Sequence, residues 1–420
     1  MENLLLLVHR IPYPPNKGDK IRSYHLLKHL AATYKVHLGT FVDDADDWQH
    51  VPLVETLCEE SHFAPLHPRS ARVRSLGALL SNRSLSLDYY RDRTVQCWVD
   101  DLMRRVKIDR VLVFSSAMAQ YVEAYTDTTR VVDFVDVDSD KWRQYADKKS
   151  WPMSWLYRHE ARQLLRYERR VAITCDASLF VSEPEAALFK KLAPESAPKI
   201  GFFNNGVDTD YFSPGRDYPD PYLPAAGPVV AFTGAMDYWP NIDAVQWFVT
   251  EVFPTLRRSH PTLRFAIVGA RPSDAIKAFA DRDGIVVTGT VDDVRPYIAH
   301  AAIAIAPLRI ARGIQNKVLE AMAMARPTVV SPQALEGIDA APGIELQVAT
   351  TAAEFVATVS SLLGREDCAM GEAARRKVER AYSWPSNLAA IDVRLESGAS
   401  SLKTAIQQIG RTFDQSPTQS

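Results

Sequence analysis

Short apolar segments alternate with amphipathic ones in both halves of this chain of 420 residues. The first half carries such segments at residues 4–8, 36–41, 110–114, 131–135 and 178–181, and the second half at 229–234, 264–269, 285–288, 302–306 and 328–330. Strands that are apolar on both faces and alternate with helices are typical of parallel sheets. The sequence therefore predicts an α/β protein with two doubly wound, Rossmann-like domains.

A Pro/Gly-rich segment at residues 213–228 separates the two halves. Proline removes a backbone donor and disrupts helices and central strands, so this segment is predicted to be a linker. The domains flanking it are expected at residues 1–212 and 229–384. An amphipathic helix at 385–397 has no strand after it, and the polar residues 398–420 are expected to be weakly ordered.

Composition and charge narrow the class of protein. The formal net charge of −2 gives no general attraction to nucleic acid, so no nucleic-acid partner is expected. The apolar residues 4–8 lack the basic segment that begins a signal peptide, and no apolar run reaches the roughly 18 residues of a membrane span. We therefore expect a cytoplasmic protein, with reduced thiols at its four cysteines, Cys58, Cys97, Cys175 and Cys368.

A strand, a glycine turn, a helix and a second strand follow one another between residues 301 and 331. The turn contains Gly313, the helix carries Lys317 and Glu320 on one face, and Arg326-Pro327 precede the second strand. Backbone amides at a helix start after such a turn favour phosphate groups. This unit is predicted to hold a phosphorylated ligand.

This unit resembles the C-terminal domain of the family-four retaining glycosyltransferases, which have the GT-B fold. The matching segments are 306–308, Gly313, 317–323 and 326–330, and further similar segments lie at 268–269, 287–290 and 292–297. Residues 9–22 and 313–317 are similar to the sugar transferases associated with exosortase-linked exopolysaccharide loci. The resemblance implies two Rossmann-like domains facing across a cleft, with the acceptor bound by the N-terminal domain and the donor by the C-terminal one.

The family's donor site implies roles for several residues of this chain. Glu320 matches the second Glu of the E-x7-E motif, which binds the ribose hydroxyls of the donor nucleotide. Arg312 stands where the first Glu belongs, and no cation follows Gly234 where many relatives hold the pyrophosphate with Arg and Lys. An alternative is that Glu320 is a surface carboxylate paired with Lys317 three residues earlier.

Because those cations are absent, other groups are expected to stabilise the departing diphosphate. We expect Arg309, Arg312 and Lys317 to act together with the amides of Gly313 and Ile314. The loop that begins the first helix would close on the phosphates from the other side, unless its lysines are simply solvated. The predicted donor site comprises Gly18, Lys20, Gly234, Asn241, Gly289, Arg309, Arg312, Gly313, Gln315, Asn316, Lys317 and Glu320.

The acceptor hydroxyl must lose a proton, and the strand at 131–135 ends in several carboxylates. Asp136 and Asp138 are the predicted catalytic contacts, although the donor phosphate itself can act as the base in retaining enzymes of this fold. An Asp-x-Asp sequence after a strand is also the metal-binding signature of GT-A glycosyltransferases. The two-domain pattern and the unit at 301–331 favour GT-B, for which no metal and no cofactor are expected.

Residues 141–170 combine nine basic and three acidic residues with three tryptophans. A basic face beside tryptophans suits the headgroup layer of an anionic membrane. The alternative is a solvated helix in which Glu160 and Glu168 pair with the basic residues and the tryptophans lie in the core.

The sequence thus predicts a glycosyltransferase that moves a sugar from a nucleoside diphosphate sugar to a growing, lipid-linked exopolysaccharide. It would work at the inner face of the cytoplasmic membrane as a peripheral protein. Two alternatives stay open: a nucleotide-sugar 2-epimerase of the same fold, and a non-catalytic protein that binds sugar nucleotides.

Overall fold

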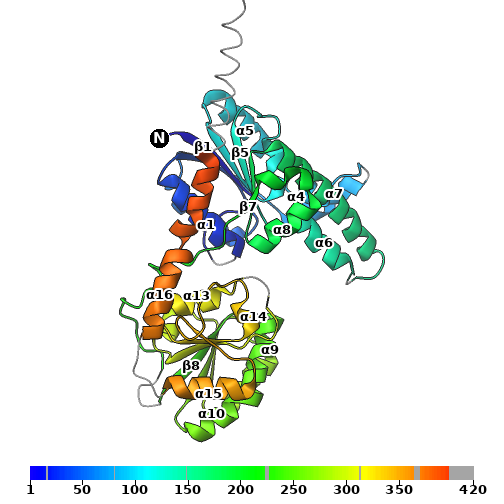
Figure 1. Cartoon of the computed structure of the whole chain (residues 1–420). Coiled ribbons are helices and arrows are strands. Elements are labelled where there is room, and N and C mark those ends of the chain that lie inside the picture. Colours follow the sequence, from blue (N-terminus) through cyan, green and yellow to red (C-terminus); the bar gives the residue numbers. More distant parts are fainter. Residues whose placement is uncertain are drawn as a thin grey trace, which may run out of the picture. The chain divides into compact units, whose positions relative to one another are not determined.

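The computed structural model describes residues 1–15, 18–79, 81–147, 149–222, 227–311, 314–363 and 369–396. The chain divides into two compact units. The first unit contains residues 1–205 and the segment that begins at Asn387, and the second unit runs from Gly206 to Ser386 (Figure 1).

A parallel sheet of seven strands forms the centre of the first unit, in the order β3-β2-β1-β4-β5-β6-β7. The strands are β1 Asn3–Val8, β2 Lys35–Val42, β3 Glu60–Pro65, β4 Arg110–Phe114, β5 Thr129–Val135, β6 Ala177–Phe180 and β7 Ile200–Phe202. The five strands predicted here are confirmed within two residues at each end. The edge strands β3 and β7 were not predicted, because β3 mixes polar and apolar residues and β7 has only three residues.

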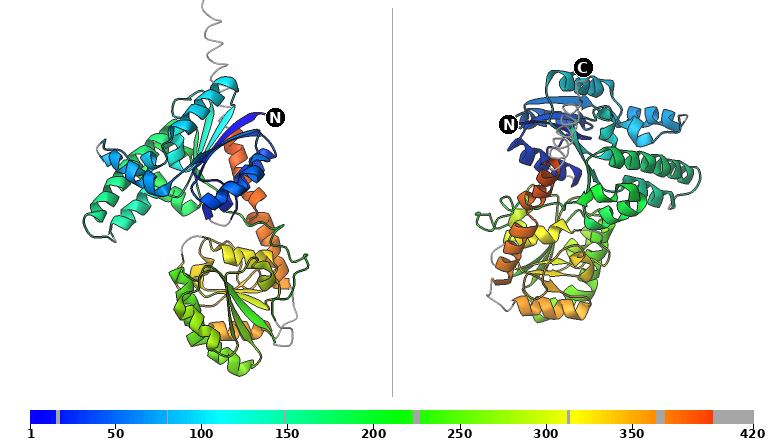
Figure 2. Two further views of the ribbon diagram at one scale, coloured as in Figure 1. Left: turned by 180° about the vertical axis from the view of Figure 1, so that it is seen from behind. Right: turned by 45° about the horizontal axis from the view of Figure 1, so that its top comes forward.

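Helices cover both faces of this sheet (Figure 2). They are α1 Gly18–Ala31, α2 Val51–Glu55, α3 Pro68–Ser75, α4 Leu85–Tyr89, α5 Arg93–Arg105, α6 Asp138–Asp147, α7 Met153–Thr174 and α8 Glu183–Leu192. Helices α6 and α7 pack together as a hairpin that projects beyond the sheet, and Figure 1 shows it on the right. None of the helices among the described residues is both long enough and apolar enough to cross a membrane.

The second unit repeats the architecture with six parallel strands in the order β10-β9-β8-β11-β12-β13. The strands are β8 Val229–Thr233, β9 Arg264–Val268, β10 Ile285–Gly289, β11 Ile303–Ala306, β12 Thr328–Val330 and β13 Gln347–Val348. Its helices are α9 Trp239–Trp247, α10 Phe253–Ser259, α11 Asp274–Lys277, α12 Arg295–Ala299, α13 Asn316–Ala323, α14 Pro332–Leu335, α15 Ala352–Leu363 and α16 Ala369–Ala381.

The helical segment that follows β8 begins at Trp239 and is not one continuous α-helix. A π-helical turn at Phe248–Val252 separates α9 from α10. Pro254 stands in the first turn of α10, where its lack of an N–H group costs no hydrogen bond within that helix. The local pattern therefore favours a new helix start at this point.

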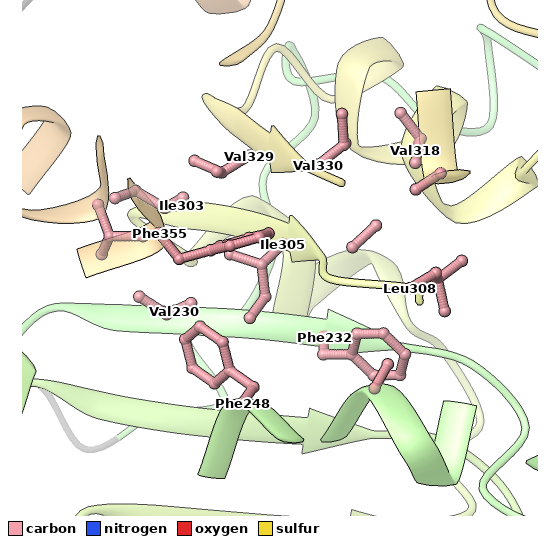
Figure 3. Close-up of a cluster of buried hydrophobic side chains, with 14 of the residues drawn as sticks. Val230, Phe232, Phe248, Ile303, Ile305, Leu308, Val318, Val329, Val330 and Phe355 are labelled. Atoms are coloured by element: carbon pink, nitrogen blue, oxygen red, sulfur yellow. The ribbon is translucent and has the colours of Figure 1, made fainter. Parts of the chain in front are cut away.

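Branched and aromatic side chains fill the space between the second sheet and its helices. Figure 3 shows Val230 and Phe232 of β8 beside Ile303 and Ile305 of β11, with Phe248 packed against them. All are buried, and each such side chain contributes about 1.5–3 kcal/mol by its removal from water. This rigid core holds the carboxyl ends of β8 and β11 in fixed positions.

The division between the units differs from the predicted boundaries at residues 212 and 384. The amide of Val207 donates to the carbonyl of Tyr382 (2.7 Å), and Arg375 donates to the carbonyl of Phe212 (3.0 Å), so residues 206–212 belong to the second unit. The helix at 384–396 leads back to the first unit, where Asp392 accepts a hydrogen bond from His29 (2.9 Å). The boundaries therefore lie at 205 and 386.

Among the described residues of the predicted linker there is no helix or strand, in agreement with its proline content. The hydroxyl of Tyr222 in this segment donates to the carbonyl of Tyr297 (3.0 Å), which ties the segment to the second unit. Cys58, Cys97 and Cys175 are free thiols as predicted, and Cys368 lies outside the described residues.

Candidate functional site

Three glycines stand where neighbouring strands of the second sheet end. Gly234 follows β8, Gly269 follows β9 and Gly289 ends β10, with φ angles of +151°, +148° and +70°. A Cβ atom at Gly269 would lie 1.8 Å from the carbonyl oxygen of Gly234, so no other residue fits there. The strand order reverses between β8 and β11 beside Gly234, and this switch point is where open α/β sheets bind ligands.

Lys317 extends from the first turn of α13 to this switch point. Its Nζ donates to Oδ1 of Asn241 (2.6 Å) and lies 4.0 Å from the ring centroid of Phe232. The Nδ2 of Asn241 donates to the carbonyl of Ala235 (2.8 Å), which fixes the orientation of the amide. A Cβ atom at Gly234 would lie 2.9 Å from the Lys317 Nζ, so the glycine leaves the room that this ammonium occupies.

Lys317 and Glu320 both have a pKa close to neutral pH. Burial lowers the pKa of Lys317 to about 7, against the opposing effect of Glu320. Burial also raises the pKa of Glu320 to about 7, against the opposing effect of Lys317. An arriving anion would favour the ammonium form of Lys317, and the amides at the start of α13 would add to the positive potential.

The other residues predicted to contact the donor from this part of the chain differ in where they lie and in their partners. Gln315 and Asn316 stand at the start of α13 as expected. Arg309 is exposed and forms a two-bond ion pair with Asp243 of α9, whose hydrogen bonding raises the pKa of the guanidinium. Its charge is therefore already compensated. Arg312 and Gly313 lie outside the described residues.

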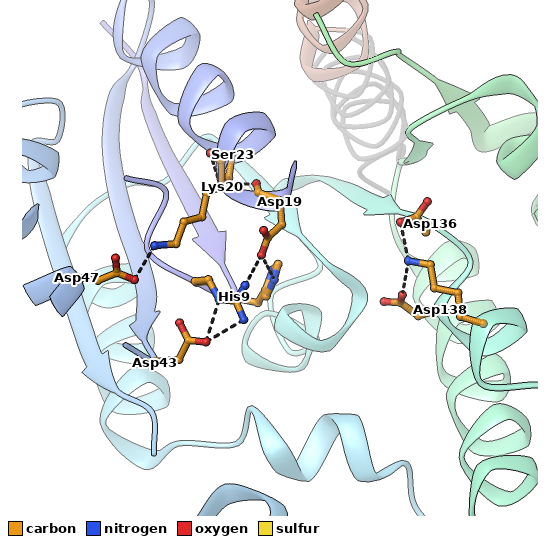
Figure 4. Close-up of polar contacts among 10 residues, drawn as sticks. His9, Asp19, Lys20, Ser23, Asp43, Asp47, Asp136 and Asp138 are labelled. Atoms are coloured by element: carbon orange, nitrogen blue, oxygen red, sulfur yellow. Dashed lines mark hydrogen bonds and ion pairs between the residues drawn. The ribbon is translucent and has the colours of Figure 1, made fainter. Parts of the chain in front are cut away.

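The predicted donor contact of Lys20 is wrong. The side chain is buried with 1% of its surface exposed, and its Nζ pairs with Asp47 at 2.5 Å (Figure 4). Arg22, two residues further along α1, is likewise buried and pairs with Asp133 at 2.8 Å. The alternative of solvated lysines also fails for Lys20, because acidic residues on β5 and after β2 draw these cations inward. Gly18 begins α1 and is exposed.

Asp136 and Asp138 lie together at the end of β5, as predicted, and Lys141 joins them. Its Nζ is 2.6 Å from Oδ2 of Asp136 and 3.3 Å from Oδ1 of Asp138 (Figure 4). Burial raises the pKa of Asp138. For Lys141, burial lowers the pKa but the two carboxylates outweigh it and raise the pKa above its usual value. The strained Val135, with φ at +67°, makes the sharp turn that presents these groups.

A cavity of about 200 Å³ opens beside the two carboxylates and is also lined by His9, Asp19 and Tyr90. The Nε2 of His9 is 3.4 Å from Oδ2 of Asp19, and the ring stacks on Phe114 with 5.7 Å between centroids. Within the described part of the chain, the buried Nδ1 of His9 has no hydrogen-bond partner. If Nε2 carries the proton toward Asp19, Nδ1 offers a lone pair, which is the arrangement of a general base.

Sequence reasoning missed His9 and Asp19, although a signal was present. His9 directly follows β1 and Asp19 lies in the first turn of α1, so both belong to the carboxyl edge of the sheet, as do Asp136 and Asp138. The strand order places β4 between β1 and β5, and this short distance across the sheet brings the groups together.

Residues 227–365, within the second unit, match a family model described as glycosyl transferases group 1. No curated protein sequence matches the chain. Among solved structures, the sucrose-phosphate synthase of Thermosynechococcus elongatus is similar over 98% of this chain and all of its own, with a TM-score of 0.60 and 14% identity. A glycosyltransferase from Rickettsia africae is similar over 94% and 98%, with a TM-score of 0.63 and 14% identity.

Anabaena HepE, solved in complex with UDP, is similar over 94% of this chain and 100% of its own, with a TM-score of 0.61 and 14% identity. The chain has the GT-B fold. Its two sheets correspond to the two Rossmann-like domains of that fold, as the sequence predicted.

The basic and aromatic segment of this GT-B chain forms the α6–α7 hairpin. Glu160 and Glu168 do not pair with its basic residues, as the alternative supposed, because both are buried. Glu160 accepts hydrogen bonds from Ser84 and from the amides of residues 85 and 86, and Glu168 accepts two from Ser139. Among the described residues, no ion pair neutralises Arg158, Arg162 or Arg166.

The tryptophans of this hairpin do not lie in the core either. Trp151 is 80% exposed and Trp155 is 49% exposed, beside the exposed Met153. Trp142 is partly buried and packs against Tyr157 with 5.1 Å between ring centroids. The tip of the hairpin is therefore an apolar surface next to uncompensated arginines.

Proposed function

We propose that this protein is a glycosyltransferase that uses a nucleoside diphosphate sugar as its donor and binds that donor in the second unit. The observation that carries the proposal is the ammonium of Lys317 held by Asn241 over Phe232, at the switch point of a domain that matches glycosyl transferases group 1. The UDP complex of HepE, which shares the fold, supports a nucleotide donor.

In this proposal, Lys317 and the first amides of α13 stabilise negative charge on the departing diphosphate. Glu320, one turn further along α13, accepts hydrogen bonds from the ribose hydroxyls. The positive charge comes from the protein, so we expect activity in the presence of a chelator such as EDTA. Retention of the anomeric configuration remains part of the proposal.

The acceptor hydroxyl would enter the cavity of the first unit that His9, Asp136 and Asp138 line. His9, oriented by Asp19, and the two carboxylates are the groups within that cavity that can take up or hold the acceptor proton. Lys141 holds the two carboxylates close together.

We further propose that the acceptor is a lipid-linked exopolysaccharide precursor at the inner face of the cytoplasmic membrane. The exposed Trp151, Met153 and Trp155 at the tip of the hairpin, together with the arginines of α7, suit an anionic lipid surface. Each arginine near such a surface would contribute about 1 kcal/mol to binding.

The experiment is to incubate the full chain with a panel of UDP-, GDP-, dTDP- and ADP-sugars, with and without membrane-extracted lipid-linked glycans. Release of nucleoside diphosphate only when acceptor is present is the expected result. Conversion of the donor without acceptor would favour the epimerase, and binding without any turnover would favour the non-catalytic alternative.

A further inference from the structure

A second, larger cavity of about 760 Å³ lies in the first unit between the α3–α4 segment and the α6–α7 hairpin. It shares four lining residues with the smaller cavity, and these are Ser86, Tyr90, Asp138 and Lys141. The two cavities are therefore adjacent, and together they form a groove that leads away from the carboxylates. Its volume is that of a site for a ligand larger than one sugar ring.

The hairpin determines the order of side chains along this groove. Helix α6 starts at the carboxylates with Asp138 and then presents Trp142 and Tyr145 on successive turns. Helix α7 returns from the tip, so that Met153 is outermost, Tyr157 follows and Leu164 reaches the smaller cavity. Leu164 is eleven positions after Met153 in the helix, a distance of about 16 Å along its axis. The groove thus changes from charged through aromatic to apolar.

The middle of the groove is made of aromatic rings that brace one another. Trp142 lies 5.1 Å from Tyr157 and 6.0 Å from Tyr145, measured between ring centroids, with tilted and edge-on geometry. Tyr145 remains 51% exposed, so its ring is available to a ligand. Aromatic faces bordered by the hydroxyl groups of tyrosine and serine fit sugar rings, which have apolar C–H faces and polar rims. An acyl chain would leave those polar groups without partners.

We propose that this groove binds the glycan part of the acceptor, with more than one sugar unit lying along the hairpin between the reacting hydroxyl and the lipid. The end that receives the new sugar lies at Asp136 and Asp138, and the lipid-bearing end lies at the tip near Met153. The proposal rests on the proposed function, which supplies the acceptor class, and adds where and how that acceptor is recognised.

The test uses glucan, galactan and mannan oligosaccharides from monosaccharide to hexasaccharide as probes of the full chain, with binding followed by calorimetry. We expect at least one series to bind more tightly as its length increases. Tyr145→Ala should weaken that binding by up to about tenfold, the value of one lost aromatic contact. Tyr238→Ala, which removes an exposed tyrosine of the second unit, should leave oligosaccharide binding unchanged.

Vesicles of phosphatidylglycerol and phosphatidylcholine provide the competing probe. If Tyr145→Ala weakens vesicle binding and not oligosaccharide binding, the groove takes lipid and the proposal is overturned. Absence of any gain with oligosaccharide length overturns it as well. Nucleotide-sugar binding by the second unit is measured in parallel. Length-dependent glycan binding without donor binding would support the groove proposal and refute the proposed donor site.

Discussion

The Nζ of Lys317 lies 2.6 Å from the Oδ1 of Asn241, and this contact joins the helix that follows β11 to the helix that follows β8. These two strands are neighbours at the point where the strand order reverses. A cation from α13 thus occupies the space that Gly234 leaves open, on a chain that has no basic residue directly after that glycine. A diphosphate bound here would replace the Asn241 oxygen as the partner of the ammonium.

Proton uptake on nucleotide binding is the first prediction. At pH 8 the free Lys317, with a pKa of about 7, is mostly neutral, and a bound diphosphate restores its charge. Binding of the preferred nucleoside diphosphate should therefore take up as much as about one proton at pH 8. Calorimetry in buffers of different ionisation enthalpy measures this number. Lys317→Met should abolish the uptake; an unchanged value in that variant would place the protonation elsewhere.

The second prediction is that nucleotide binding releases protons at lower pH, because of Glu320. At pH 6 its carboxyl is mostly protonated, since its pKa is about 7, and it must ionise to accept two ribose hydroxyls. Nucleotide binding at pH 6 should therefore release protons, and Glu320→Gln should remove the release. Uptake at both pH values in the wild type would contradict the assigned role.

A methyl group at Gly234 should disturb the donor site specifically. It would lie 2.8 Å from Asn241 Nδ2 and 2.9 Å from Lys317 Nζ, so Gly234→Ala should weaken nucleotide binding by about tenfold or more. Gly343→Ala is the matched control, because Gly343 also has a positive φ, +83°, but an added Cβ meets nothing within 4 Å. Both variants should lose about 1–2 kcal/mol of stability from backbone strain. Equal nucleotide affinity in the two variants would refute the steric argument.

The buried Glu168 should make the stability of the first unit depend on pH. Burial raises its pKa to about 8 in the folded chain, against about 4.3 in the unfolded chain. Folding therefore favours the protonated carboxyl, and this contribution to stability is fully present below pH 4.3 and is lost as pH rises through 8. Urea unfolding at pH 6 and pH 9 should show a drop that Glu168→Gln reduces. The same drop in both proteins would assign it to another group.

His9 and Asp138 should matter for turnover and not for donor binding. Replacement of a general base typically lowers kcat by 10² to 10⁴-fold, so His9→Ala or Asp138→Asn should fall in that range if the residue takes the acceptor proton. Donor affinity should be unchanged, because both residues belong to the first unit. Steady-state kinetics with varied acceptor decide which of the two carries the larger effect.

The central strands could be predicted from sequence because they are apolar on both faces. Residues 110–114 and 328–330 coincide with β4 and β12 in full. Edge strand β3 could not be found in this way, since its residues are partly exposed and mixed in polarity. Nor could the domain boundary at residue 205, because it depends on Val207 and Phe212 bonding to residues about 170 positions away.

The site residues differ in the same way: some can be recognised from their own segment, and others depend on residues far away in the sequence. Asp136 and Asp138 could be selected because they come shortly after the end of β5, and Asn241 and Lys317 because each lies in the first turn of a helix that follows a strand. The burial of Lys20 could not be predicted from its own segment, because it depends on Asp47, which lies beyond the next strand. His9 was overlooked because its ring meets Phe114 only when β1 and β4 pair.

Donor binding by the second unit is the central claim, and saturation-transfer NMR tests it most directly. The full chain would be measured against UDP-, GDP-, dTDP- and ADP-sugars, with Glu320→Ala as the site variant and Glu336→Ala, an exposed glutamate of the same unit, as the control. We predict signals from one nucleotide class. The binding free energy of that class should be weaker by about 1–3 kcal/mol in Glu320→Ala and unchanged in Glu336→Ala. Absence of signal from all four classes, or equal signals from all three proteins, would contradict the donor site described here.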